Sequence, residues 1–317
     1  MMRILAVLAL LLPARAALAA ALAFALIGDV PYNRFERTWF ADYLAQVTAD
    51  EVDFVIHAGD IKSGGEYCSD ELFDDRLGRF DASPIPFVLV PGDNEWSDCD
   101  RRSAGRYDPL ERLEALRRRF FPPHSSLGRR RMAVASQADV MPGSPYRENL
   151  IWQAGPATFV TLNVVGPSNG RGRGKKVPAE FARRNGANLA WLAHGAAEAR
   201  ARGSAALVIT MQANPWIEAF VKGDPHPGFG ELVAALRLVA ETFEGQVLLL
   251  HGDQHVLTID QPLTDRHGRP LANFTRVQCY GSPLMGWVRI VIDPAALPVL
   301  SITPNAYSPT PPGKVSP

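Results

Sequence analysis

The sequence predicts an α/β fold built around a parallel β-sheet. Three apolar runs, residues 24–29, 52–60 and 85–93, each end in a polar turn that contains Gly-Asp. Between them, segments 35–49 and 70–80 carry Phe, Trp, Leu and Val at helical spacing. Strand, polar turn, helix and strand in this order is typical of βαβ units, which join parallel strands.

The middle of the chain continues this alternation. A helix is predicted for residues 107–121, followed by an irregular Pro- and Arg-rich insert that reaches about residue 147. The runs NLIWQAG and ATFVTLNVVG then predict a hairpin that turns at Gly155-Pro156. A long helix is expected from Pro178 to about residue 202, because Pro suits a first helical turn and Gly203 an end.

The last third ends in β-structure. The strand AALVITMQANPW, a helix over 230–243 and the strand QVLLLHGDQH come first. After residue 256 only short strands are predicted: 257–260, 275–280, 288–293 and 298–303. The final run, SPTPPGKVSP, has no core-forming residues and predicts a flexible tail over 306–317 behind a single domain over 21–305.

Composition places the chain among ordinary globular proteins. Of its 317 residues, 47% are hydrophobic and 21% charged, which excludes global disorder. The 33 basic and 33 acidic residues give a net charge of zero, so no basic field predicts nucleic-acid binding. The Arg runs 117–119 and 129–131 lack interleaved aromatic residues and are interpreted as solvated surface.

Residues 1–20 resemble an export signal. Arg3 supplies a positive start, residues 4–12 an apolar stretch, and Ala17-Leu18-Ala19 a small-residue cleavage site. The apolar stretch is short for a bilayer span, so no stable membrane insertion is expected after cleavage. This predicts a periplasmic or secreted protein; a buried first helix or an uncleaved anchor including residues 20–26 is the alternative.

Export changes the interpretation of the three cysteines. Cys68 and Cys99 each follow a predicted strand end, in loops expected at the same sheet edge. In an oxidising compartment such a pair can form a disulfide. Cys279 is then left as a buried small residue, and the absence of CxxC spacing argues against structural zinc.

Polar side chains recur at five predicted strand ends. They are Asp29; His57 and Asp60; Asp93, Asn94 and Glu95; Gln212 and Asn214; and His251, Asp253 and His255. Carboxyl ends of parallel strands meet in one crevice, where several carboxylates repel one another unless a cation joins them. Each Gly-Asp alone is equally consistent with a capped turn, and His57 with a hydrogen-bonded core histidine. The recurrence in chain order favours the metal site.

The order of these motifs resembles the calcineurin-like metallophosphoesterases. GD, GD, PGDNE, a polar break and HGDQH follow the family's D-x-H, G-D, G-N-H-[DE], lone His and G-H-x-H, over roughly residues 24–293. The resemblance implies a four-layer αββα sandwich of two mixed β-sheets flanked by helices. It also implies two metal ions and hydrolysis of a phosphoester.

Carried over position by position, the resemblance assigns six metal ligands: Asp29, Asp60, Asp93, Gln212, Asp253 and His255. Asp60 corresponds to the carboxylate shared by both metals. Asp93 replaces the family's asparagine, Gln212 its lone histidine and Asp253 the first histidine of the last motif, while Pro31 stands where a histidine is lost. This oxygen-rich set predicts one or two divalent cations, with Mg²⁺ or Mn²⁺ favoured over Zn²⁺ and Ca²⁺ also accommodated. Without a cation, the carboxylate pKa values should rise.

The family's catalytic histidine is replaced by Asn94, which can orient a phosphate but cannot supply a proton. His57, His251 or Lys62 could take that part if the fold brings one within reach. Glu95 matches the family's terminal acid and is expected behind the ligands. The sequence therefore supports a metal-dependent phosphoesterase of an unidentified substrate, or a catalytically silent protein that holds a metal or anion on the same scaffold.

Two other classes of enzyme are disfavoured. The segment GPSNGRGRGKK follows a strand, but Asn169 and Lys176 stand where a P-loop needs Gly and Ser/Thr. It is interpreted as a basic loop that could meet an anionic substrate. The G-x-S-x-G match at residues 166–170 lies within this same loop and is not followed directly by a predicted helix, which argues against the nucleophile elbow of an α/β-hydrolase. Trp96 and Trp216 adjoin motif residues and fit either the core or the wall of a pocket.

Overall fold

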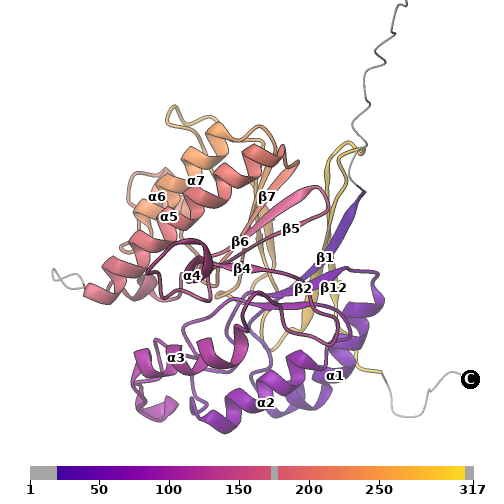
Figure 1. Ribbon diagram of the computed structural model, residues 1–317, viewed down its shortest axis with the longest axis vertical. Helices are drawn as coiled ribbons and strands as arrows, with labels where there is room; N and C mark the ends of the chain where they lie inside the picture. The colour runs from indigo at the N-terminus through magenta and orange to yellow at the C-terminus, as the bar shows by residue number, and fades with distance from the viewer. Residues whose placement is uncertain (1–19, 173–177, 311–317) are drawn as a thin grey trace, which may run out of the picture.

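A computed structural model describes residues 20–172 and 178–310. Two β-sheets pack against each other between helices α1–α3 on one side and α5–α7 on the other (Figure 1). This is the predicted α/β sandwich, and its two mixed sheets confirm the fold class. Most of the predicted export signal, the end of the predicted tail and part of the basic loop lie outside the described residues.

The first sheet has the strand order β12-β11-β1-β2-β3. Strands β1 (Leu22–Ile27), β2 (Phe54–His57) and β3 (Phe87–Leu89) are parallel, as the three Gly-Asp repeats predict. Strands β11 (Gly286–Ile292) and β12 (Leu300–Ala306) complete it in antiparallel pairing. The first strand of the chain therefore lies beside a strand from its far end.

The second sheet has the order β4-β5-β6-β7-β8-β10-β9. Its parallel centre consists of β6 (Ala157–Thr161), β7 (Ala206–Thr210), β8 (Gln246–His251) and β10 (Phe274–Gln278). The edges β4 (Ala135–Ser136), β5 (Leu150–Ala154) and β9 (Thr258–Asp260) are antiparallel. The hairpin of β5 and β6 turns at the predicted Gly155-Pro156.

The five long helices coincide with the predicted ones. They are α1 (Arg34–Ala49), α2 (Asp70–Asp81), α3 (Pro109–Phe120), α5 (Ala179–Arg202) and α7 (Gly230–Thr242). Asn33, Ser69 and Asp108 cap the first three by accepting a bond from a backbone N–H in the first turn, and Gly203 ends α5 in a left-handed conformation.

Short elements were not predicted. The insert expected to be irregular contains β4 and the one-turn helix α4 (Gln137–Val140), whose Ser136 and Asp139 form a reciprocal capping box. A second short helix, α6 (Ile217–Val221), follows the polar break after β7. Single-turn 3-10 helices cover Arg102–Ala104 and Ser168–Gly170. Each is too short to show a hydrophobic period, so the sequence pattern gives no signal for it.

An aromatic cluster fills the space between the sheets. Phe24 and Phe54 of the first sheet stack at 5.4 Å between ring centroids, and both meet Phe159 of the second edge-on. Trp152 stacks on Phe159 at 4.9 Å. These rings belong to one buried core, and a second core lies between the other face of the second sheet and helices α5 and α7. Packing of the sheets through large rigid rings fixes how their strand ends face one another.

Cys68 and Cys99 form the predicted disulfide, with Cα atoms 5.8 Å apart, and Cys279 is free and buried. The bond joins the loop after β2 to the loop after β3. Both sulfurs lie near the carbonyl oxygen of Asn94, at 3.4 and 3.7 Å. The disulfide thus braces the backbone beside the third Gly-Asp turn.

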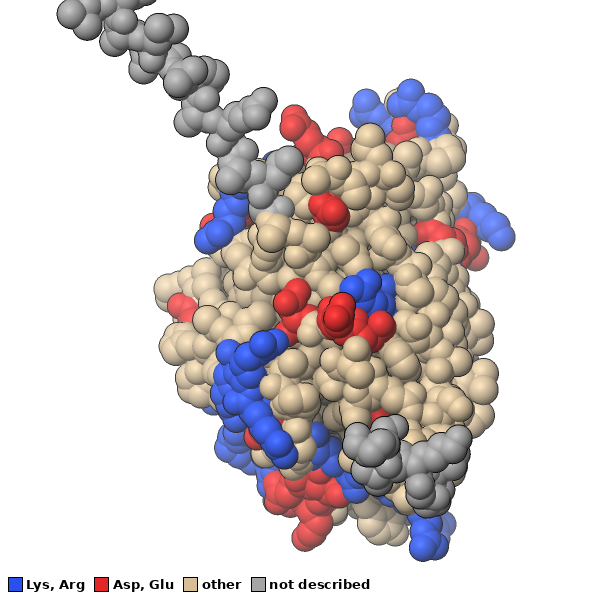
Figure 2. All heavy atoms as spheres, turned by 90° about the vertical axis from the view of Figure 1, so that its right-hand side faces the viewer, with Lys and Arg blue, Asp and Glu red and all other residues tan. Residues whose placement is uncertain are grey.

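On the face shown in Figure 2, uncharged residues cover most of the area, and basic and acidic side chains lie next to one another in several small groups. Among the described residues, no helix has the length and apolarity needed to cross a bilayer. Beyond β12, Tyr307 and Thr310 bond to Asp42 of α1, so this part of the predicted tail lies against the fold.

Candidate functional site

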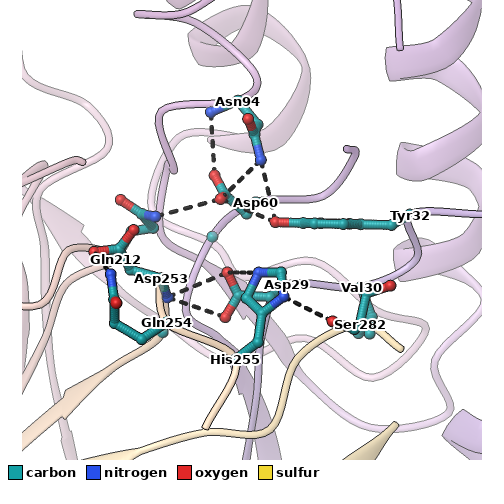
Figure 3. A network of polar contacts seen from close by, with 12 residues as sticks. Asp29, Val30, Tyr32, Asp60, Asn94, Gln212, Asp253, Gln254, His255 and Ser282 are labelled. Carbon is teal, nitrogen blue, oxygen red and sulfur yellow. Dashed lines mark hydrogen bonds and ion pairs between the residues drawn. The ribbon is translucent and has the colours of Figure 1, made fainter. Parts of the chain in front are cut away.

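The polar strand ends meet at one edge of the two sheets. Asp29, Asp60 and Asp93 follow β1, β2 and β3, and Gln212 and Asp253 follow β7 and β8. His255 and Asn94 join them, so the structure brings all six predicted ligands and Asn94 into one cluster (Figure 3). The cluster is largely buried, with Asp29 and Gln212 fully inaccessible. The cluster takes residues from both sheets, so it forms only when the two sheets pack against each other.

Left-handed backbone conformations mark the cluster. Asp29, Asp60, Asp253 and His255 have φ values of 53°, 57°, 81° and 58°. Such conformations cost an L-residue on the order of 1 kcal/mol each and persist where surrounding contacts enforce them. Four of them in one group of polar side chains are a signature of a functional site.

Glycine allows the closest backbone approach. A Cβ atom on Gly92 would lie 2.0 Å from Oδ1 of Asp60 and 2.3 Å from its backbone nitrogen. Only glycine leaves room for the turn after β3 to cross the Asp60 carboxylate. Close packing against Asp60, in addition to turn formation, therefore requires glycine at position 92.

Asp29 and His255 form one corner of the site. Nε2 of His255 lies 3.6 Å from Oδ1 of Asp29, and Nδ1 lies 2.7 Å from the carbonyl oxygen of Ser282. Because that carbonyl only accepts, Nδ1 carries a proton, so Nε2 is the ring nitrogen that faces the carboxylate. A proton on Nε2 or a cation can join these two groups across the 3.6 Å between them. The orientation by a backbone carbonyl is typical of a metal-binding histidine.

Asp253 joins this corner through its backbone. Its N–H donates to both carboxylate oxygens of Asp29, at 3.2 and 3.1 Å. Its own Oδ2 accepts from the backbone N–H of Asn214 at 3.1 Å and from Gln254 at 3.2 Å. The loop after β8 is thereby tied to the end of β1.

Neutral donors surround the Asp60 carboxylate. Oδ1 accepts from the backbone N–H of Asn94 at 3.1 Å. Oδ2 accepts from the Tyr32 hydroxyl at 3.0 Å, from Nδ2 of Asn94 at 2.9 Å and from Nε2 of Gln212 at 3.3 Å. Nδ2 of Asn94 also lies 3.1 Å from the Tyr32 hydroxyl. Four hydrogen-bond donors thus meet the carboxylate that the resemblance assigns to both metals.

Glu95 holds the backbone beneath the site. Its carboxylate accepts from the backbone N–H groups of Asp60 and Ile61, at 3.1 and 3.3 Å, and from that of Gly92. The side chain thus links the turn after β2 to the turn after β3, the supporting part that its motif position implies. Lys62 is buried nearby, and burial lowers its pKa although Glu95 and Asp60 oppose this.

Burial dominates the electrostatics of the cluster. It raises the pKa of Asp29 and of Asp60 well above their usual value, with further increases from neighbouring carboxylates that include Asp93. Burial also raises the pKa of Asp253, and it raises the pKa of Glu95 to about 7. A group of desolvated acids with elevated pKa values lacks positive charge, and a cation would supply it.

The structure does not bring His57 to the cluster. Its Nε2 lies 2.8 Å from the carbonyl oxygen of Val30, and its Nδ1 accepts from the backbone N–H of Gly59 at 3.2 Å. Its ring packs against Phe80 and Phe87, and burial lowers its pKa to about 4. Both nitrogens are therefore committed in a neutral ring, which matches the alternative of a core histidine.

His251 also stays outside the cluster. It is fully buried, with Nδ1 2.9 Å from the carbonyl oxygen of Gly252, and burial lowers its pKa to about 4. Its electrostatic neighbours are Arg276 and Glu218, the latter on α6. Nζ of Lys62 donates to the carbonyl oxygen of Ser63. None of the three predicted proton donors bonds to a residue of the cluster.

Sequence reasoning missed Tyr32 and Asp98. Tyr32 lies three residues after Asp29, and an aromatic hydroxyl just after a polar strand end is the only signal that could have pointed to it. Its ring also meets that of His255 edge-on, at 5.2 Å between centroids. Asp98 neighbours Asp93, and burial together with that carboxylate raises its pKa to about 7.

The groups at Asp29 and His255 fit a divalent cation. Among the described residues, no group of three or more His, Cys, Asp or Glu side chains is arranged to hold a metal ion by itself. Asp29 and His255 nevertheless offer two facing donors. Hard cations such as Mg²⁺ are often bound through one or two protein ligands, with water and phosphate oxygens completing the shell. The Asp60 carboxylate, in contrast, already accepts hydrogen bonds from Tyr32, Asn94 and Gln212.

Comparisons with known proteins agree with this architecture. The sequence profile of the family described as calcineurin-like phosphoesterase matches residues 22–197, more than half of the chain. Gln212, Asp253 and His255 lie beyond the matched segment. A search of curated proteins gave no match.

Two solved structures show the same fold. A dimetal phosphatase from Danio rerio is 14% identical with a TM-score of 0.52, and the alignment covers 90% of this chain and 96% of that one. A purple acid phosphatase from yellow lupin (Lupinus luteus) seeds is also 14% identical, with a TM-score of 0.50 and coverage of 86% and 49%. The profile match, the two sheets and the cluster at their shared edge together establish that this chain belongs to the calcineurin-like phosphoesterase family.

Proposed function

We propose that this protein is an exported phosphoester hydrolase that uses a divalent cation, Mg²⁺ or Mn²⁺ in preference to Zn²⁺, with Ca²⁺ also accommodated. The observation that carries the proposal is that two groups able to bind a metal, Nε2 of His255 and Oδ1 of Asp29, face each other 3.6 Å apart beside a group of buried acids. Family membership and the two phosphatases of the same fold support the reaction class.

Asp29 and His255 would hold the cation, with Asp253 beside them. When bound, it supplies positive charge for phosphoryl oxygens and makes a nucleophile available from water at neutral pH. Ser282 fixes the ring of His255 through its carbonyl oxygen. The N–H of Asp253 fixes the carboxylate of Asp29, and both constraints reduce the reorganisation that binding requires.

Tyr32 and Asn94 would orient the phosphate. Their donor groups touch each other and Oδ2 of Asp60, and the Tyr32 side chain is half-buried, so one side of the pair can face a ligand. A phosphate oxygen can accept from both when it approaches. The substrate is a phosphoester whose organic part the residues of the site do not specify.

A catalytically silent binding protein is the second candidate, and one observation favours it. Asn94 can donate a hydrogen bond but cannot act as a general acid. His57, His251 and Lys62 do not bond to the cluster. A leaving alkoxide would then depend on solvent for its proton, which penalises substrates with poor leaving groups. Aryl phosphates, whose leaving groups need little protonation, are therefore the best first substrates.

Export is part of the proposal. The leader-like composition of residues 1–20 supports it, and so does the disulfide between Cys68 and Cys99, because such bonds persist in oxidising compartments. The expected location is the periplasm or the outside of the cell.

The test is cation-dependent hydrolysis. The full chain is stripped with chelator and assayed on an aryl phosphate monoester and diester, with Mn²⁺ or Mg²⁺ added. We expect turnover only with cation, and a loss of at least about 100-fold in Asp29→Asn and His255→Ala, on the scale of removing one electrostatic group from a site. The controls Asp224→Asn and His267→Ala alter exposed residues and should match the wild type.

Each result separates the candidates. Cation binding by calorimetry without turnover on either ester would reject the hydrolase and support the silent protein. No cation binding at micromolar concentrations would reject the metal site altogether, while the fold would stand.

A further inference from the structure

The amide nitrogen of Gln212 lies between two carboxylates. Nε2 is 3.1 Å from Oδ1 of Asp93 and 3.3 Å from Oδ2 of Asp60. An amide group has two N–H bonds, one for each oxygen. Gln212 thus links the carboxylates after β3 and β2 by donation, from a residue that is fully buried.

The orientation of this amide is fixed by its other atom. Oε1 of Gln212 accepts from the backbone N–H of Gly166 at 2.8 Å. Rotating the amide by 180° would set two donors against each other there and set its oxygen against two carboxylates. The backbone is anchored as well, because the carbonyl oxygen of Gln212 accepts from Gly252 at 3.0 Å. The resemblance assigns Gln212 as a metal ligand, and the carbonyl oxygen that it would have to use already accepts from Gly166.

This amide opposes a cation between Asp60 and Asp93. It donates to one oxygen of each carboxylate, where an ion would use a lone pair at about 2.1 Å, and its N–H₂ group has no lone pair to add. The Tyr32 hydroxyl and Nδ2 of Asn94 occupy Oδ2 of Asp60 further. Three neutral donors converge on the carboxylate that would have to bridge two ions.

We propose that this chain holds one divalent cation and not two, and that the Gln212 amide takes the place of the second. The single ion lies at Asp29 and His255. This inference rests on the cation of the proposed function but is independent of turnover.

The direct test counts ions in the full-length protein. Mn²⁺ is titrated into metal-free wild type in the presence of inorganic phosphate and followed by calorimetry and electron paramagnetic resonance. We expect one Mn²⁺ per chain and the spectrum of an isolated ion at saturation. Two ions with an exchange-coupled spectrum would overturn the inference and leave the proposed function standing; no binding would overturn both.

A variant tests the part assigned to Gln212. Gln212→Glu has nearly the same shape but replaces the N–H₂ donor by an acceptor, so Asp60 and Asp93 lose their bridge and gain a third carboxylate. We expect its stoichiometry to rise to two and its thermal stabilisation by Mn²⁺ to exceed that of the wild type. The matched control Gln254→Glu adds the same charge beside Asp253 without touching Asp60 or Asp93, and should stay at one.

The outcomes remain decisive if Gln212→Glu fails to fold. The wild-type count and spectrum test the stoichiometry alone, and Gln212→His offers a neutral acceptor at the same position. A folded Gln212→Glu and a folded Gln212→His that both bind one ion would contradict the assignment of Gln212 as the excluding group.

Discussion

The hydroxyl of Tyr32 lies 3.0 Å from Oδ2 of Asp60, on the same oxygen that Asn94 reaches with its amide. Tyr32 lies in the loop after β1 and Asp60 in the turn after β2, so the contact ties these two segments together. It also places an aromatic hydroxyl at the position where a phosphate would meet the site.

Replacing Tyr32 by Phe should weaken both folding and catalysis. The change removes one donor from a buried carboxylate, which costs about 1 kcal/mol of unfolding free energy, measured by urea denaturation. Loss of a phosphate contact of similar strength should lower kcat/KM by roughly tenfold. The control Tyr67→Phe alters an exposed ring and should do neither. Unchanged kcat/KM in Tyr32→Phe would remove Tyr32 from the site.

Replacing His57 by Gln should spare activity. The amide can donate to the carbonyl of Val30 and accept from Gly59, as the imidazole does. We expect kcat within about threefold of wild type and a loss of about 1–2 kcal/mol in unfolding free energy, because the ring also packs against Phe80 and Phe87. A folded variant that loses 100-fold or more in kcat would show that His57 acts in catalysis.

The disulfide should be measurable and stabilising. Its loop spans 31 residues, for which loop-closure entropy predicts about 3–4 kcal/mol. We expect the Cys68→Ser/Cys99→Ser double variant to lose that amount in urea unfolding, and Cys279→Ser to serve as the free-thiol control. Thiol titration of unfolded, unreduced protein should detect Cys279 alone. Three reactive thiols would contradict the bond.

Without cation, stability should fall as pH rises above about 6.5. Burial raises the pKa of Glu95 and of Asp98 to about 7, while unfolded carboxyls titrate near 4. In this range the folded chain binds protons that the unfolded chain has released, so the unfolding free energy decreases with pH. Burial lowers the pKa of His57 and His251 to about 4, so these groups act in the opposite direction while the unfolded histidines still bind protons, a contribution that fades above about pH 7.

Melting temperatures measured in chelator from pH 6.5 to 8 give the slope of stability against pH. Glu95→Gln should flatten it, whatever its effect on stability at a single pH, and added Mn²⁺ should reduce it by supplying the missing positive charge. A melting temperature that rises with pH over this interval would contradict the elevated pKa values.

The sequence predicted the strand ends and long helices because both depend on local signals. Apolar runs closed by Gly-Asp gave β1, β2 and β3, and Pro178 and Gly203 marked the two ends of α5. The strand order then determines that these ends meet, so the cluster was predictable as a group of residue types. Whether those residues bind a metal stays a prediction.

Side-chain direction was not predictable. His57 ends β2 inside the core, where the two bonds to its ring come from Val30 and Gly59, and nothing in the motif order distinguishes that from a position in the site. The amide of Gln212 likewise owes its orientation to Gly166, on a different loop. Such contacts depend on how the two sheets pack, which a linear pattern does not encode.

Because β1 lies between β2 and β11, the first sheet can be completed only after the C-terminal part of the chain has been synthesised. Asp29 is synthesised early, yet its side chain bonds to Asp253, and its carbonyl oxygen accepts from Ser282. At typical elongation rates the ribosome needs roughly ten seconds or more to add the intervening segment. During that time the site does not exist, so the nascent chain cannot capture a cation at these residues. If the chain folds only after the export that we propose, the site first meets the ions of the compartment in which it folds.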